Sequence, residues 1–265
     1  MVALNIIVLI KQVPDPKAFV GLKEDGTLDR EKAAAVINPY DKNALEAALL
    51  LKQQQDAWIT VISMGPPNAE NALRNALAMG ADDAYLLSDR KLGGCDTLAT
   101  AYALSCAVRK VGNYDLILCG MEATDGNTAQ VGPEIAERLG ISQLTWVDQF
   151  TLDGDYVNAR RMLEGGHEQV RAKLPVLLTI TNTANTPRYP TFGGILKAEK
   201  QTVTPWTADD AEIDETKVGL GGSPTKIRKI DRAVSSRSKY TPEGCSVAET
   251  LDNLLIKLQD DGVQL

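Results

Sequence analysis

The residues with the clearest chemical potential lie in the segment TDGNTAQVGPEIAERLG, residues 124–140. This segment follows an apolar run at residues 115–120 and leads into a helical pattern. Gly126 and Gly132 give the backbone freedom at the entrance to that helix. Since a helix N-terminus presents unpaired N–H groups and a partial positive charge, this entrance suits a phosphate. A capped turn that bends at glycine explains the same residues equally well.

Side-chain catalysis is not expected from this sequence. The single histidine, His167, follows Glu-Gly-Gly, a pattern typical of a solvated hairpin turn. The four cysteines are widely spaced and form no C-x-x-C pair, which argues against an iron–sulfur or zinc site. A Ser-His-Asp or Cys-His arrangement is therefore improbable. We expect no catalytic side chain and no metal, so any redox chemistry must come from a bound cofactor.

Charge and hydropathy exclude two further classes of partner. The 265-residue chain has a formal net charge of -7 and a pI near 4.9, which argues against nucleic acid as the main partner. No apolar run is long enough to span a bilayer, so we expect no membrane insertion. The N-terminal MVALNIIVLIKQV has no basic leader and no small-residue cleavage site, which indicates a first strand and a cytoplasmic protein.

Alternating strand and helix patterns must position the candidate loop. Strands are expected at residues 4–10, 58–64, 84–87 and 114–120. Helices are expected at residues 41–54, 68–80 and 96–112, the last with Asp96 as its N-cap and Gly112 past its end. The alternation predicts an α/β fold in which helices cover both faces of a Rossmann-like parallel sheet.

The chain changes character after residue 140. Short strand patterns with turns at Asp153-Gly154 and Gly165-Gly166 predict antiparallel additions to the same sheet. From about residue 201 the chain is polar until residues 246–261, a helical pattern with one apolar face made by Val247, Leu251, Leu254, Leu255 and Leu258. We expect a nucleotide-binding domain at residues 1–200 and an arm at residues 201–265. The arm either packs on its own domain or embraces another subunit.

Ligand contacts are expected beyond the carboxyl ends of the parallel strands. The loops LIKQVPDP, SMGPP and CGMEATDGN follow three of these strands and are rich in Gly, Pro or small residues. INPYD opens the first helix, with Asn38 and Asp41 as capping candidates. Neither G-x-G-x-x-G after the first strand nor a P-loop occurs, so an adenine-nucleotide cleft of another type is expected.

Several ordered blocks resemble the β subunit of electron-transfer flavoproteins. They are VLIKQVPD, INPYDKNALEAALLLK, VISMGPP, NALAMGADDAYLL, DGNTAQVGPEIAERLG and, most specifically, VRAKLPVLLTITNTANTPRYPTFGGILKAEK at residues 170–200. The resemblance implies an adenine-nucleotide hydrolase-like sheet and a heterodimer with an α subunit that carries FAD. It also implies that the C-terminal arm and helix embrace that α subunit.

The resemblance leaves the nucleotide open between two branches. Ordinary members hold AMP as a structural ligand, whereas electron-bifurcating members hold a second FAD that NADH reduces. DGNTAQVGP is similar to bifurcating members, although Met121-Glu122-Ala123 departs from the RQA or KQA of many relatives. We therefore expect FAD with NADH as donor, and electrons divided between ferredoxin or flavodoxin and the α-subunit flavin. A stand-alone nucleotide hydrolase-like enzyme is a third alternative.

Site residues follow from the resemblance one by one. The implied nucleotide contacts are Leu9, Asn38, Pro39, Tyr40, Asp41, Met64, Asp125, Gly126, Asn127, Thr128, Ala129, Gln130, Val131 and Gly132. Gly126 and Ala129 are expected to leave room for a diphosphate, and Asp125 to face ribose, water or a backbone donor.

A second set is implied in a partner-recognition loop at about residues 183–196, which would dock an acyl-CoA-type or 2-hydroxy-acid dehydrogenase. Its members are Pro187, Arg188, Tyr189, Thr191 and Phe192. Phe192 stands where relatives carry a leucine that anchors the dehydrogenase. The alternative for Phe192 is a place in the protein's own core.

Overall fold

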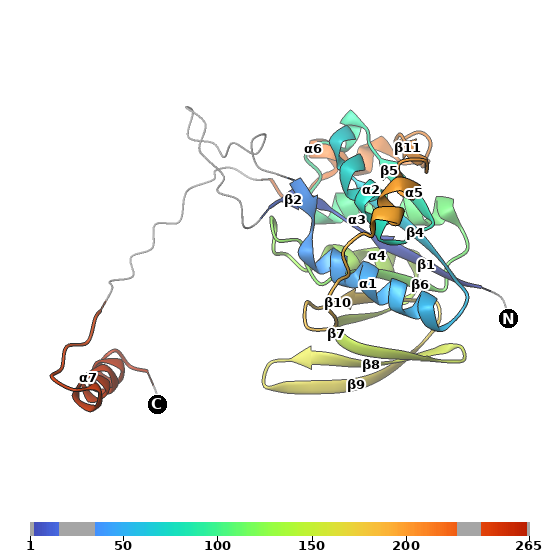
Figure 1. Ribbon diagram of the computed structural model, residues 1–265. Helices are drawn as coiled ribbons and strands as arrows, with labels where there is room; N and C mark the ends of the chain where they lie inside the picture. The colour runs from blue at the N-terminus through green and yellow to red at the C-terminus, as the bar shows by residue number, and fades with distance from the viewer. Residues whose placement is uncertain (1–2, 16–34, 227–239, 264–265) are drawn as a thin grey trace. The chain divides into compact units, whose positions relative to one another are not determined.

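Residues 3–15, 35–226 and 240–263 are described by a computed structural model of the chain (Figure 1). The chain divides into two compact units, Met1–Lys226 and Ile227–Leu265, which are treated separately.

A nine-stranded sheet forms the centre of the first unit, in the order β11-β5-β4-β1-β6-β10-β7-β8-β9. The seven strands from β11 to β7 pair in parallel, and β8 and β9 add an antiparallel ribbon at one end. The α/β fold with a parallel sheet and antiparallel additions is therefore confirmed. The strands are β1 (Leu4–Leu9), β4 (Ala57–Met64), β5 (Asp83–Leu87), β6 (Leu116–Gly120), β7 (Ser142–Asp153), β8 (Tyr156–Leu163), β9 (Gly166–Lys173), β10 (Val176–Ile180) and β11 (Val203–Trp206).

Helices cover both faces of this sheet, as the buried strand patterns require. On one face, Ile6 and Val8 of β1 share a core with helices α1 (Pro39–Gln54) and α2 (Glu70–Met79). On the other face, Ile7 and Leu9 share a core with α3 (Thr97–Val111) and α4 (Val131–Leu139). Successive strand residues point to opposite faces, so one apolar run in β1 supplies both cores.

Element boundaries follow local chemistry closely. Asp96 caps α3 by accepting from the N–H of Ala99 at 3.0 Å, and the positive φ of Gly112 ends that helix. α1 begins earlier than expected, because Pro39 fits the first helical turn. Before α2, the short 3₁₀ helix η1 (Pro67–Ala69) occupies the start of the expected helix, and η2 (Arg90–Leu92) follows β5. A small second sheet pairs β2 (Gln12–Pro14) with β3 (Ala35–Ile37).

Four short elements within residues 192–222 were not expected from the sequence. The seven-residue helix α5 (Phe192–Ala198) lies within the expected recognition loop and contacts α2 (Figure 1). β11 pairs with β5 at the sheet edge, where its Pro205 costs no central ladder hydrogen bond. It is followed by the 3₁₀ helix η3 (Glu215–Lys217) and by α6 (Gly219–Gly222). The first compact unit thus extends to Lys226, past the boundary expected at residue 200.

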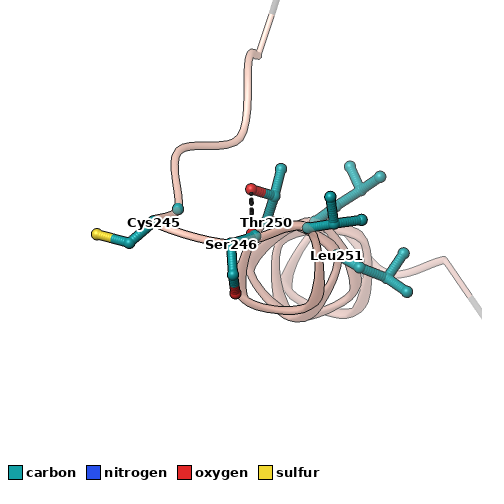
Figure 2. Close-up of a pocket in the computed structure, with 7 residues that line it drawn as sticks. Cys245, Ser246, Thr250 and Leu251 are labelled. Atoms are coloured by element: carbon teal, nitrogen blue, oxygen red, sulfur yellow. Dashed lines mark hydrogen bonds between the residues drawn. The ribbon is translucent and has the colours of Figure 1, made fainter.

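The second unit contains α7 (Val247–Asp260), close to the expected helix. Ser246 caps it by accepting from the N–H of Glu249 at 3.2 Å. No residue of α7 is buried, and Figure 2 shows Leu251 beside a hollow that Val247, Thr250 and Leu254 also line. The rest of the expected arm at residues 227–239 lies outside the described residues. Among the described helices, none combines the length and hydropathy needed to cross a membrane.

Candidate nucleotide-binding site

A buried carboxylate joins the carboxyl ends of two neighbouring strands. Asp41, in the first turn of α1, accepts from the N–H of Lys11 at 2.7 Å and from the N–H of Gly120 at 2.9 Å. Lys11 follows β1 and Gly120 ends β6, so the side chain of Asp41 fixes the backbone at the carboxyl ends of both strands. A Cβ on Gly120 would lie 2.5 Å from Asp41 Oδ1, which explains why glycine ends this strand.

Burial decides the protonation of this carboxylate. The side chain is 6% exposed, and desolvation raises the pKa of Asp41 to about 7. The two backbone donors, Asn38 and the charge of Lys11 lower the pKa but do not offset burial. Asp41 is therefore an architectural group with an ionisation near neutral pH.

Asn38 ties a third segment to the same edge. It occupies the N-cap position of α1, but its side chain makes no capping hydrogen bond, contrary to expectation. Instead its Nδ2 donates to the carbonyl of Glu122 at 2.8 Å and its Oδ1 accepts from the N–H of Thr124 at 3.2 Å. The side chain is fully buried, so Asn38 holds the start of the β6–α4 loop.

The β6–α4 loop gains its curvature from residues other than those expected. Asn127 and Ala129 have left-handed φ angles of 48° and 54°, whereas Gly126 does not. A Cβ at Gly126 would meet no atom within 4 Å, so Gly126 faces open space. A Cβ at Gly132 would lie 2.9 Å from both Cys119 Sγ and Thr179 Cγ2. Gly132 therefore serves close packing of α4 on the sheet, and the expected role in backbone freedom is wrong.

This curvature leaves backbone donors without acceptors among the described residues. The N–H groups of Gly126 and Asn127 donate to the carbonyl of Ala123 at 3.1 and 2.8 Å. Within the part of the chain that the structure describes, the N–H groups of Thr128, Ala129 and Gln130 have no acceptor. α4 begins directly afterwards at Val131, with Pro133 in its first turn as its ring requires. Free N–H groups at a helix entrance suit an anion.

The remaining expected contacts differ in accessibility. Leu9 is buried in the core below the loops, so its side chain is closed to a ligand. Pro39, Tyr40 and Met64 are half-buried at the same edge, and Gln130 is exposed. The structure therefore groups most of the expected residues at one edge, while Leu9 and Gly132 contribute through packing.

Lys11 was missed by sequence reasoning. Its Nζ lies 2.7 Å from Oδ1 of Asp125, so the loop after β1 is bridged to the β6–α4 loop. Asp125 was expected to face ribose, water or a backbone donor, and it faces a lysine instead. The available signal was the position of Lys11, directly after an apolar strand and two residues beyond Leu9.

The expected docking residues form a separate surface. Glu46 of α1, 4% exposed, accepts from the N–H of Arg188 at 3.0 Å and from its guanidinium at 2.8 Å. Thr191 caps α5 by accepting from the N–H of Gly194. Tyr189 is 91% exposed and Phe192 77% exposed, so Phe192 does not pack into the core. Pro187 is half-buried at the base of the segment.

His167 is not in the turn itself but is the second residue of β9. Its Nε2 lies 3.5 Å from Asp148 Oδ2, and Arg160 pairs with the same carboxylate. Across the described ranges, no group of His, Cys, Asp or Glu side chains is arranged to hold a metal ion.

The mostly parallel sheet, with helices on both faces and polar loops at its carboxyl edge, defines a Rossmann-like α/β protein. The electron transfer flavoprotein domain family matches residues 25–211. Proteins similar to this chain include electron transfer flavoprotein β subunits. That of Clostridium acetobutylicum is 51% identical over 85% of this chain and 87% of its own length. That of Thermoanaerobacterium thermosaccharolyticum is 48% identical over 96% and 98%.

A third relative is subunit CarD of the caffeyl-CoA reductase-Etf complex of Acetobacterium woodii. It is 40% identical over 97% of this chain and 98% of its own length. The chain therefore belongs to the electron transfer flavoprotein family, as a β subunit.

Proposed function

We propose that the chain binds FAD at the carboxyl edge of its sheet and serves in flavin-based electron bifurcation. The observation that carries this proposal is the β6–α4 loop, which has three N–H groups unpaired within the described chain and open space at Gly126. A cradle of this kind accommodates a diphosphate that continues past the loop. When bound, the flavin supplies hydride and single-electron transfer, with NADH as the donor.

The chain's own residues would hold and orient this group. The N–H groups of residues 128–130 would bind phosphate oxygens, because they are unpaired in the part of the chain described and carry partial positive charge. Tyr40 and Met64, half-buried at the same edge, contact the less polar parts of the ligand. Asn38 and Asp41 hydrogen-bond to the backbone of the surrounding loops, so they set the shape of this edge.

The proposed partners follow from two exposed surfaces. The apolar face of α7 would pack on the α subunit, since no residue of α7 is buried by the described part of its unit. Tyr189 and Phe192 would dock an acyl-CoA-type or 2-hydroxy-acid dehydrogenase, with Lys197 and Lys200 attracting an acidic surface. The name of CarD, a subunit of a caffeyl-CoA reductase complex, supports a partner of the acyl-CoA class. Ferredoxin or flavodoxin would receive the low-potential electrons.

Flavin content tests the proposal directly. The chain is purified with its α subunit, and the nucleotides released on denaturation are counted. We expect about two FAD per heterodimer, both bleached by NADH. One FAD with one AMP would overturn the bifurcating assignment and favour an ordinary scaffold. ATP turnover by the chain without a partner would favour the hydrolase-like alternative.

A further inference from the structure

Among the described residues, the carboxyl edge of the sheet is poor in positive charge for a site that would receive an anion. Four described segments meet at the carboxyl edge: residues 9–15, 38–41, 64–69 and 120–130. Their acidic residues are Asp15, Asp41, Glu122 and Asp125, and Lys11 is the single basic residue within these segments. Asp125 lies in the same loop as the free N–H groups, three residues before Thr128. An uncompensated carboxylate at that place would repel a phosphate.

Both main-chain polar groups of Lys11 are hydrogen-bonded, so the position from which its side chain extends is fixed. Its N–H donates to Asp41 at 2.7 Å, and its carbonyl accepts from the N–H of Asn38 at 2.8 Å. From this position the side chain reaches Asp125 at 2.7 Å and is still 48% exposed. An ammonium group has three donors, and Asp125 takes one of them. The other donors can bind a second anionic oxygen.

We propose that Lys11 is a phosphate-binding residue of the nucleotide site, and that Asp125 positions its ammonium group at the entrance of the β6–α4 loop. Lys11 neutralises Asp125 and adds a charge-assisted hydrogen bond to the ligand. This inference rests on the proposed nucleotide site, but not on the flavin, because AMP and FAD share the adenine nucleotide phosphate.

Replacement of Lys11 separates its charge from its structural role. The structural hydrogen bonds of Lys11 come from its main chain, so Lys11→Met should fold with an unchanged melting temperature. Titration of the nucleotide-depleted heterodimer with ADP should show binding roughly tenfold weaker or more. Lys11→Arg keeps the charge and should bind within about threefold of the unmodified protein.

Lys173 offers a matched control, since it is exposed on β9 and has no ion pair among the described residues. Lys173→Met makes the same change in net charge and should leave ADP binding unaltered. Unchanged ADP binding in Lys11→Met would overturn the proposal. Equal losses in Lys11→Met and Lys11→Arg would overturn it as well, because the charge would then be irrelevant. A count of one FAD and one AMP would refute the bifurcating function while leaving this test intact.

Discussion

Two regions of the first unit depart from the usual pattern of burial: one buries polar side chains, and the other exposes aromatic side chains. At the carboxyl edge of the sheet, Asn38 and Asp41 bury polar side chains at 0% and 6% exposure. In the proposed docking segment, residues 183–196, Tyr189 and Phe192 leave aromatic side chains in solvent. Buried polar groups are tolerated when they are fully hydrogen-bonded, and here they fix the shape of loops. Exposed aromatic groups on a Pro- and Gly-rich segment instead mark a contact surface.

One helix supports both regions. The first turn of α1 holds the exits of β1 and β6 through Asp41, and the next turns hold the docking segment. Asn43 donates to the carbonyl of Asn185 at 2.8 Å, and Glu46 pairs with Arg188. Substitutions in the two regions should therefore distinguish residues that hold the loop conformation from residues that contact a partner or ligand.

The largest effect is expected at the anchor of the docking segment. Glu46→Ala removes the partner of Arg188 and leaves a half-buried guanidinium and an N–H unpaired. Loss of one member of such a pair costs about 3 kcal/mol of unfolding free energy. We expect a lower melting temperature and weaker transfer to the dehydrogenase, with the nucleotide content unchanged at low temperature. A loss of bound nucleotide together with unchanged stability would contradict the separation of the two regions.

Phe192→Ala should remove a contact with the dehydrogenase without changing the conformation of the docking segment. Its side chain is 77% exposed, so the melting temperature should stay within a degree or so of the unmodified protein. Electron transfer to the cognate dehydrogenase should fall about tenfold or more, as expected for an anchor residue worth about 2 kcal/mol. Steady-state transfer assays measure this. Undiminished transfer would exclude Phe192 from the interface.

Asp41→Asn tests the nucleotide edge through pH. With a folded-state pKa of about 7 against 3.8 in a solvated aspartate, the folded protein keeps a proton that the unfolded chain releases between these values. This contribution to stability is complete below pH 3.8 and is lost as the pH rises through 7. Relative to Asp41→Asn, the unmodified protein should lose roughly 1.4 kcal/mol per pH unit between about pH 5 and 6. Urea unfolding across this range should show the slope, and parallel stability curves would argue against it.

The smallest effect is expected at Gly126. Gly126→Asp fits without steric conflict, since a Cβ there meets no atom within 4 Å. The added carboxylate should weaken nucleotide binding by about 1 kcal/mol, because like charges about 4 Å apart repel. Gly126→Ala is the control and should bind as the unmodified protein does. A full complement of nucleotide at low free concentration in the Asp variant would remove this loop from the phosphate site.

The sequence predicted elements whose signals are local. Asp96 and Gly112 mark the two ends of α3 through hydrogen bonds to residues at most four positions away. The apolar runs of the buried strands can likewise be recognised without knowing which strands they pair with. Short elements such as α5 and β11 are stabilised by packing on α2 and by pairing with β5, so the hydrophobic periodicity of their own sequence does not predict them. The pairing partners of Lys11 and Asn38 could not be predicted from the sequence. Lys11 meets Asp125, 114 residues away, and Asn38 meets Thr124, 86 residues away, and no local pattern encodes such pairs.

The strand order also determines when the sheet can be completed during synthesis of the chain. β10 is made after the β7–β9 ribbon but inserts between β6 and β7, and β11 is the last strand to join the sheet. A chain emerging from the ribosome N-terminus first cannot complete its sheet before Trp206 is free. Residues 227–265, with α7, leave the ribosome only afterwards. The segment proposed to bind the α subunit is therefore synthesised only after every strand of the first unit has been made.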